Sequence, residues 1–174
     1  MRLIAFLIAT FCLYAEPANQ SAEGYLTYGN EILNSVQVNG FVTLNGTTIL
    51  QQLQVNGNLS ANQAQIGAMM VNGQASLNNC TVKNKSVVAG SLSAMLSTFS
   101  DEITLASDNS TFDACTIASI RVRKNNASPP TIELKGKTKV TGLITFESGN
   151  GQVIASPDSQ ISAAQITGGE LKKN

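Results

Sequence analysis

Histidine and tryptophan are absent from this 174-residue chain, and only 5% of its residues are aromatic. Without histidine, the chain cannot form a Ser-His-Asp or Cys-His catalytic group or an imidazole metal site. It also lacks the phosphate-binding Gly-x-x-x-x-Gly-Lys motif and the dinucleotide fingerprint. Charged residues make up only 13% of the chain and balance to a net charge of zero, which predicts no strong attraction to nucleic acid or anionic lipid. We therefore expect no cofactor and no nucleic-acid partner.

Acidic residues are also too scattered to predict a hydrolytic site. Asp101 and Glu102 are adjacent, so on a strand they point to opposite faces. Asp108 lies in a Ser-Asp-Asn-Ser turn signal, which favours a solvated loop. Glycosidases need two facing carboxylates, and the sequence provides no obvious pair. We predict that the protein is not an enzyme.

Long apolar runs are missing except at the N-terminus, where residues 1–15 read MRLIAFLIATFCLYA. One basic residue, Arg2, precedes an apolar run from Leu3 to Leu13, and the small residue Ala15 follows. This order is typical of a secretory signal peptide, with a buried N-terminal strand or helix as the alternative. The run is shorter than the roughly 20 residues that span a bilayer. We predict an exported protein without a transmembrane span, located in the periplasm, on the cell surface or outside the cell.

The remaining chain is rich in Asn, Ser, Thr, Gly and Val, and its apolar residues recur with a constant period. Val-Asn-Gly occurs three times, and continuing the same step of roughly 17 residues gives a series that holds its phase, the signature of a repeat architecture. A second apolar series runs ahead of the first and a third behind it. The third breaks at Asn109 and Asn126, which predicts irregular coils there. The first series is Val38, Val55, Val71, Val88, Leu105, Val122 and Val140; the second is Leu33, Leu50, Ile66, Val82, Phe99, Ile117 and Leu134; the third is Val42, Leu59, Ala75, Leu92 and Ile144.

A unit of this length is too short for helical solenoids, whose repeats run about 33 to 47 residues. Three strands of four or five residues joined by tight corners fill it, and each coil then stacks on the next at about 4.8 Å. The sequence therefore predicts an all-β, single-stranded β-helix (a β-solenoid) of seven to eight coils. The alternative is an antiparallel sandwich in which each Asn-Gly is a hairpin turn. We expect an N-terminal cap or linker at 16–32, the solenoid at 33–155, and a C-terminal cap with a frayed, charged tail at 156–174.

The Asn-Gly pairs suit the corners of such a coil, because both residues tolerate positive φ. Asn39, Asn56 and Asn72 would then stack on one another as a ladder of side-chain amides.

Several of these units also resemble the bactofilins, which are polymer-forming bacterial cytoskeletal proteins. The resemblance covers roughly residues 36–146. It implies a right-handed triangular β-helix that polymerises end to end without a nucleotide. Bactofilins typically work in the cytoplasm, however, whereas this chain begins with a predicted export signal, and a shared fold does not imply a shared role. The stretches that carry the resemblance are Val55-Asn-Gly-Asn-Leu-Ser-Ala, Val71-Asn-Gly-Gln-Ala-Ser-Leu, Val88-Ala-Gly-Ser-Leu-Ser-Ala and Val140-Thr-Gly-Leu-Ile.

Basic residues alternate with apolar or small ones at Arg121, Arg123, Lys135, Lys137 and Lys139. Alternation predicts that they project from one strand face. Arg121 and Lys139 are separated by about one repeat and are expected to stack on neighbouring coils. The face formed by Arg121, Arg123, Lys137 and Lys139 would either bind an anionic glycan or phosphate, or protect a sheet edge from unwanted pairing.

Two further pairs depend on the same period. Lys85 and Glu102 are one repeat apart, which predicts an exposed ion pair between coils. Cys80 and Cys115 are two repeats apart, which places their Cα atoms about 9.6 Å from each other and beyond disulfide reach. We predict two unpaired cysteines.

These observations favour a non-enzymatic, exported structural β-solenoid that assembles end to end with copies of itself in the cell envelope. The alternative is a surface adhesin or glycan-binding module that uses an exposed face of the solenoid. Its partner would be an envelope polysaccharide or another surface protein.

Overall fold

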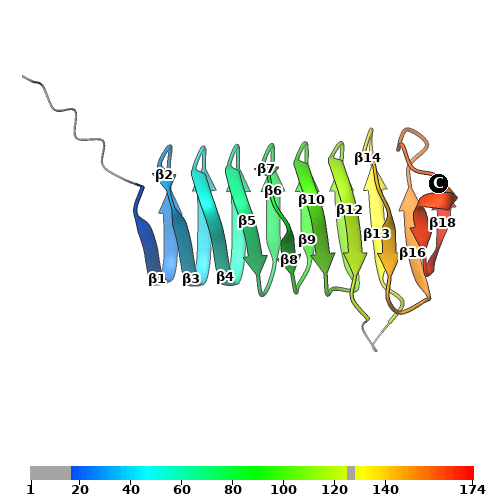
Figure 1. Cartoon of the computed structure of the whole chain (residues 1–174), viewed down its shortest axis with the longest axis horizontal. Coiled ribbons are helices and arrows are strands. Elements are labelled where there is room, and N and C mark those ends of the chain that lie inside the picture. The colour runs from blue at the N-terminus through cyan, green and yellow to red at the C-terminus, as the bar shows by residue number, and fades with distance from the viewer. Residues whose placement is uncertain (1–16, 125–127) are drawn as a thin grey trace, which may run out of the picture.

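The computed structural model describes residues 17–124 and 128–174 as a parallel β-solenoid of about nine turns, with about 17 residues in each turn. The turns follow one another in a row from the N-terminal to the C-terminal end (Figure 1). The all-β fold class and the β-solenoid are confirmed, with about nine turns in place of the predicted seven to eight. The predicted signal peptide, residues 1–15, lies outside the described residues.

Strands and one short 3-10 helix make up the described regular structure. The elements are β1 (Asn19–Tyr28), β2 (Ile32–Leu33), β3 (Ser35–Asn45), β4 (Thr48–Asn62), β5 (Gln65–Val71), β6 (Ala75–Asn78), β7 (Thr81–Val82), β8 (Ser86–Val88), β9 (Leu92–Met95), β10 (Thr98–Leu105), β11 (Asn109–Asp113), β12 (Thr116–Val122), β13 (Thr131–Lys135), β14 (Lys139–Val140), β15 (Ile144–Phe146), β16 (Gly151–Ala155), η1 (Ala163–Gln165), β17 (Ile166–Thr167) and β18 (Gly169–Lys173).

Each turn contributes three strand segments, and each segment pairs in parallel with its equivalent in the next turn. In one turn these segments are Val36–Val38, Val42–Leu44 and Thr48–Ile49. We call the three stacks of equivalent segments the first, second and third faces. Alternate residues of each segment are buried inside the tube, where equivalent apolar side chains stack into ladders. No single turn could bury its own inner side, so the fold requires many turns.

The predicted first apolar ladder lies on the inner side of the first face. Its members Val38, Val55, Val71, Val88, Leu105 and Val122 pair one with the next. The next member is Phe146, which pairs with Val122, whereas Val140 pairs with Ile117 on the third face. The assignment of Val140 to this ladder is therefore wrong.

A longer connection between β12 and β13 causes this shift. The step from Val122 to its partner Phe146 exceeds an ordinary turn, because the chain between the two strands carries extra residues that include Pro129 and Pro130. Proline has no backbone N–H and is disfavoured inside a sheet, and strand pairing resumes at Thr131, directly after Pro130. A step of one ordinary repeat taken across this connection leads to a different face.

The predicted second series is wrong at Leu50, which points outward, and at Leu134, which lies on another face. Ile49, not Leu50, pairs with Ile66 on the third face, and Leu50 is 47% exposed. A shift of one residue moves a side chain from the inner to the outer side of a strand. Leu134 belongs to the second face, where it pairs with Phe112.

The third series also differs from its prediction after Leu92. Ser110 pairs with Leu92 in the preceding turn and with Ile132 in the following turn. The third series therefore continues through Ser110, one residue after the predicted break at Asn109. Asn126 lies outside the described residues. Ile144 belongs to the first face and pairs with Ile120.

The described stack extends further at both ends than the predicted 33–155. At the N-terminal end, β1 lies within 16–32 and pairs with β3 along its whole length. At the C-terminal end, β17 and β18 lie within 156–174 and continue the parallel pairing. The tail that was predicted to be frayed forms β18 because Leu171 stacks on Val153 in the second-face register.

The Asn-Gly pairs form the corner between the first and second faces. At Gly40, Gly57 and Gly73, φ is +140°, +144° and +155°, a conformation that residues with a Cβ rarely adopt. Each glycine also lies against the corner of the preceding turn, so that a Cβ on Gly57 would overlap the carbonyl oxygen of Gly40. Glycine is therefore required both for the backbone conformation and for the close approach of successive turns.

The predicted amide ladder is formed between its first two members. Asn56 Nδ2 donates to Asn39 Oδ1 at 2.8 Å. Asn72 is exposed, and its backbone N–H donates to the carbonyl of Val55. The amide contacts thus link pairs of neighbouring turns, as they also do where Asn34 Nδ2 donates to Asn19 Oδ1.

A different corner joins the second face to the third, and here the sequence shows no obvious motif. In five turns a residue with positive φ turns the chain and a small buried residue follows it directly, and in the later turns Thr138 and Ser159 take the place of that small residue. Leu96 and Ala114 are two of the turning residues, with φ of 51° and 50°. The small residues are Thr47, Ala64, Cys80, Ser97, Cys115, Thr138 and Ser159, all buried; we call them the small-residue corner.

Hydroxyl groups in the small-residue corner connect successive turns. Ser97 Oγ donates to the carbonyl of Met95 at 2.8 Å and accepts the backbone N–H of Cys80 at 3.0 Å. The backbone N–H of Cys115 donates to Thr138 Oγ1 at 3.2 Å in the same way. Buried hydroxyls that are satisfied in this manner avoid the cost of an unpaired polar group.

We expect the Gly57→Ala substitution to lower the free energy of unfolding by about 3 kcal/mol, through backbone strain and overlap with the preceding turn. Gly149→Ala is the matched control, because Gly149 also has positive φ, +77°, but has open space around its Cβ position. It should cost only about 1 kcal/mol. Urea denaturation followed by circular dichroism measures both. Equal losses in the two variants would contradict the close approach of the turns.

Candidate functional surfaces

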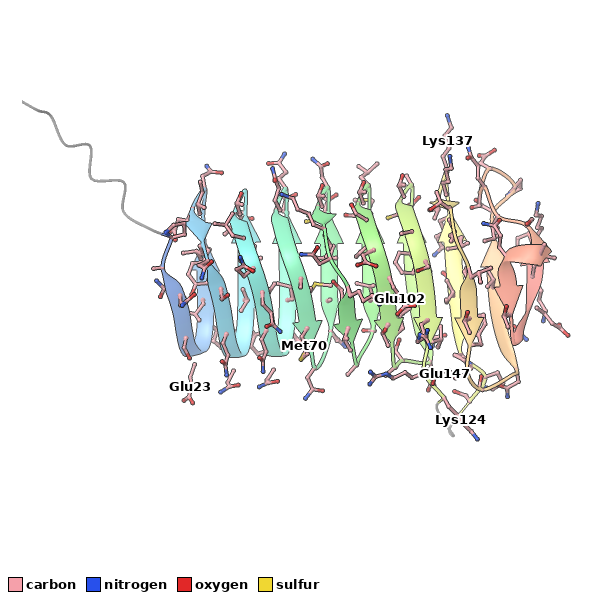
Figure 2. The ribbon with its side chains drawn as sticks, viewed as in Figure 1. Glu23, Met70, Glu102, Lys124, Lys137 and Glu147 are labelled. Atoms are coloured by element: carbon pink, nitrogen blue, oxygen red, sulfur yellow. The ribbon has the colours of Figure 1, made fainter. Side chains whose placement is uncertain are left out.

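The predicted basic face does not form as one surface. Arg121 pairs with Thr145 in the first-face register, whereas Lys139 pairs with Thr116 on the third face. The prediction that Arg121 and Lys139 stack on neighbouring turns is therefore wrong. Figure 2 shows the separation: Lys137, in the same corner region as Lys139, lies at one edge of the molecule, while Glu147, which contacts Arg121, lies near the opposite edge.

Acidic side chains accompany Arg121, one of the basic residues predicted either to bind an anion or to protect a sheet edge. Arg121 Nε lies 3.5 Å from Glu102 Oε2, and Arg121 Nη1 lies 3.6 Å from Glu147 Oε1. Glu147 Oε2 also accepts the backbone N–H of Lys124. Arg123 stands one residue beyond Val122 and therefore next to this same cluster. These exposed contacts stabilise the fold by less than about 1 kcal/mol each, but they balance the positive charge that an anion would need.

Lys85 and Glu102 directly precede the paired residues Ser86 and Ile103, so they lie on neighbouring turns as predicted. Glu102 contacts Arg121 rather than forming the expected pair with Lys85. Lys135 Nζ lies 2.7 Å from Glu133 Oε2, and this contact lowers the pKa of Glu133 and raises the pKa of Lys135. The basic residues of this region are thus divided between faces, and two of them, Arg121 and Lys135, have a carboxylate beside them.

Both predicted unpaired cysteines are free and buried, so this prediction is confirmed. Cys80 and Cys115 belong to the small-residue corner, with Ser97 between them, which is the separation of two turns that the period predicted. Burial raises the pKa of both thiols. Their Sγ atoms donate to the carbonyls of Asn78 and Asp113, so the thiols act as small packing residues.

Within residues 17–124 and 128–174, no group of three or more Cys, Asp or Glu side chains is arranged to hold a metal ion. No helix in the same part of the chain is long and apolar enough to cross a membrane.

A shallow groove on the outer side of the second face is a surface feature that the sequence did not predict. Its volume is about 460 Å³, and it runs from Phe41 on β3 to Thr111 on β11. Next to it, the rings of Tyr25 and Phe41 stack with their centroids 4.6 Å apart and their planes within 4°. Side chains alternate along a strand, so the inward positions of Val42 and Leu59 would have predicted that Phe41, Thr43 and Ser60 point to this outer side.

No family of known proteins matches this chain, and neither a curated protein nor a solved structure does. The β-solenoid is compatible with a β-helix repeat protein, and the resemblance to bactofilins stays a prediction.

We expect Cys80 and Cys115 to resist alkylation in the folded protein and to react fully after denaturation, without any intramolecular disulfide. The Cys12→Ser variant keeps the count to these two thiols. Intact-mass measurement after iodoacetamide treatment, with and without urea, provides the test. A disulfide-linked species in the absence of reductant would contradict the two-turn separation.

The same thiols predict how stability depends on pH. Folding raises the pKa values of both thiols, so above the ordinary thiol pKa of about 8.5 the unfolded chain ionises first. The contribution of the thiols to the free energy of unfolding is therefore complete below this pH and is lost as the pH rises above it. Replacing both with alanine should flatten this part of the stability profile. An unchanged slope in the double variant would show that other groups cause it.

Proposed function

We propose that the chain is a non-enzymatic, exported structural β-solenoid of the cell envelope, and that two copies join end to end through their N-terminal turns. The export part rests on residues 1–15, whose sequence has the pattern of a signal peptide. The assembly part rests on a difference between the two ends of the described solenoid.

The N-terminal end presents an open strand edge. In the described part of the chain, β1 pairs along its whole length with β3 on one side only. An unpaired edge of this length is a template for pairing with another chain. The inward side chains Leu26 and Tyr28 are only partly buried, whereas their partners Val42 and Leu44 in the next turn are 1% and 0% exposed. A second chain paired with β1 would therefore bury the apolar side chains Leu26 and Tyr28. It would also form hydrogen bonds with the unpaired backbone groups of β1.

The C-terminal end also finishes in a strand that pairs on one side only within the described residues, β18 with β16, but its side chains oppose further pairing. Gln165, in η1, donates from Nε2 to the carbonyls of Val140 at 2.9 Å and Gly142 at 3.1 Å. The last strand, β18, carries Lys172 and Lys173, and lysines on an edge strand discourage pairing. Figure 1 places β18 at this end of the row, beside β16.

A molecule in which one end alone favours pairing forms a closed pair rather than an open filament. Two N-terminal edges that face each other are related by a two-fold axis, which is the commonest symmetry of soluble oligomers. We therefore expect a dimer rather than the end-to-end polymer that the sequence suggested. The alternative, an adhesin that binds an anionic glycan at Arg121, is less well supported, because Glu102 and Glu147 already contact that residue.

The Leu26→Lys substitution should convert the dimer into a monomer, raising its dissociation constant at least tenfold, because an inward-pointing charge on an edge strand opposes pairing. Leu171→Lys is the matched control: Leu171 ends the same second-face column at the other end and is also partly buried. It should leave the dimer intact. Size-exclusion chromatography with light scattering reports the mass of each.

Three results would contradict this assembly. The unsubstituted protein could remain monomeric at high concentration, Leu171→Lys could be the variant that dissociates, or negative-stain images could show long filaments. Circular dichroism spectra of both variants confirm that the fold is retained.

A further inference from the structure

The outer side of the second face carries an uncharged strip of polar side chains over the N-terminal half of the solenoid. Hydroxyl residues occupy one outward position in six successive turns and lie in register, about 4.8 Å apart. Between Gly24 and Met95, every residue on this face is uncharged. The hydroxyl column is Thr27, Thr43, Ser60, Ser76, Ser93 and Thr111.

The groove described above lies along this column. On one side of the hydroxyls it is lined by amide and hydroxyl side chains, including Asn58, Gln74 and Asn109. A straight groove with hydrogen-bonding groups at a constant spacing matches a straight, repeating ligand that carries many hydroxyls. The absence of charge in the lining disfavours polyanions and cations, which need opposite charge.

The N-terminal end of the strip carries two stacked aromatic rings. Tyr25 is 81% exposed and Phe41 is 42% exposed, and their rings lie parallel. Exposed apolar groups gathered in this way mark interaction sites. An aromatic ring offers an apolar face, and a sugar ring with equatorial hydroxyls offers a matching face of C–H groups, while its hydroxyls remain free to hydrogen-bond.

We propose that this groove binds an uncharged β-linked polysaccharide. The part of the Phe41 ring that Tyr25 does not cover packs against one sugar ring, and the hydroxyl column with Asn58 and Gln74 hydrogen-bonds along the chain. A β-linked chain is extended and repeats its hydroxyls along a line, as the groove does. The site differs from the basic residues near Arg121, and its proposal is independent of the dimer.

Binding to microcrystalline cellulose and to chitin, both uncharged, is measured by depletion of the purified protein from solution, with alginate gel as the anionic comparison. The Tyr25→Ala/Phe41→Ala variant should weaken binding about tenfold through the lost stacking. Ser76→Asp should weaken it as well, because it places a charge in the groove. Ser100→Asp is the matched control, an exposed serine of β10 outside the groove, and should bind as the unsubstituted protein does.

The proposal is overturned if the protein binds neither neutral polysaccharide, or if it prefers alginate. It is also overturned if Ser76→Asp and Ser100→Asp bind alike and the aromatic variant loses nothing. Thermal melting of each variant verifies that the solenoid is intact, so a loss of binding reports on the groove alone.

Discussion

The hydrogen bonding of each turn to the next, at a spacing of about 4.8 Å, is the constraint on which the rest of this structure depends. It places equivalent residues of successive turns directly above one another. Each residue must therefore pack against the equivalent residue in the turn before it and in the turn after it. Apolar residues satisfy this as ladders inside the tube. At the Asn-Gly corner, Gly57 approaches the Gly40 carbonyl so closely that a side chain has no room.

The same constraint decides where buried polar groups are tolerated. In the small-residue corner, Ser97 lies between Cys80 and Cys115 and bonds to backbone of its own turn and of its neighbour. The residues at this corner are small and buried, and an unpaired hydroxyl there would be costly. The repeating corner therefore selects for small residues that can hydrogen-bond along the stack.

The sequence was sufficient for the fold class, the period and much of the register. The first ladder was correct from Val38 to Val122 because Val-Asn-Gly marks one corner in successive turns. The prediction failed at Val140 because the connection containing Pro129 and Pro130 adds residues, and a periodic pattern does not reveal how many. The Pro-Pro pair was the sequence signal that the repeat is interrupted there. The small-residue corner was not predicted because its positive-φ position is occupied by residues such as Leu96 and Ala114, which are not typical turn residues.

Candidate surfaces were harder to predict than the core, because they depend on which side chains share a face. Arg121 and Lys139 would be neighbours only if the period continued unbroken. Glu102 and Glu147 contact Arg121 from the turns on either side, an arrangement that requires the true register. The uncharged groove was not predicted because it is made of common serine, threonine and asparagine residues, which form a distinct surface only when successive turns stack.

The most direct test of this account measures distances along the third face by electron spin resonance. One nitroxide label replaces Thr48, and the second replaces Thr98, Thr116, Lys139 or Gln160 in separate variants whose native cysteines, Cys12, Cys80 and Cys115, are changed to alanine. These positions lie three, four, five and six turns from Thr48. A single parallel register predicts backbone separations that grow evenly, from about 14 Å to about 29 Å. Separations that level off or reverse, as they would in an antiparallel sandwich, would contradict it.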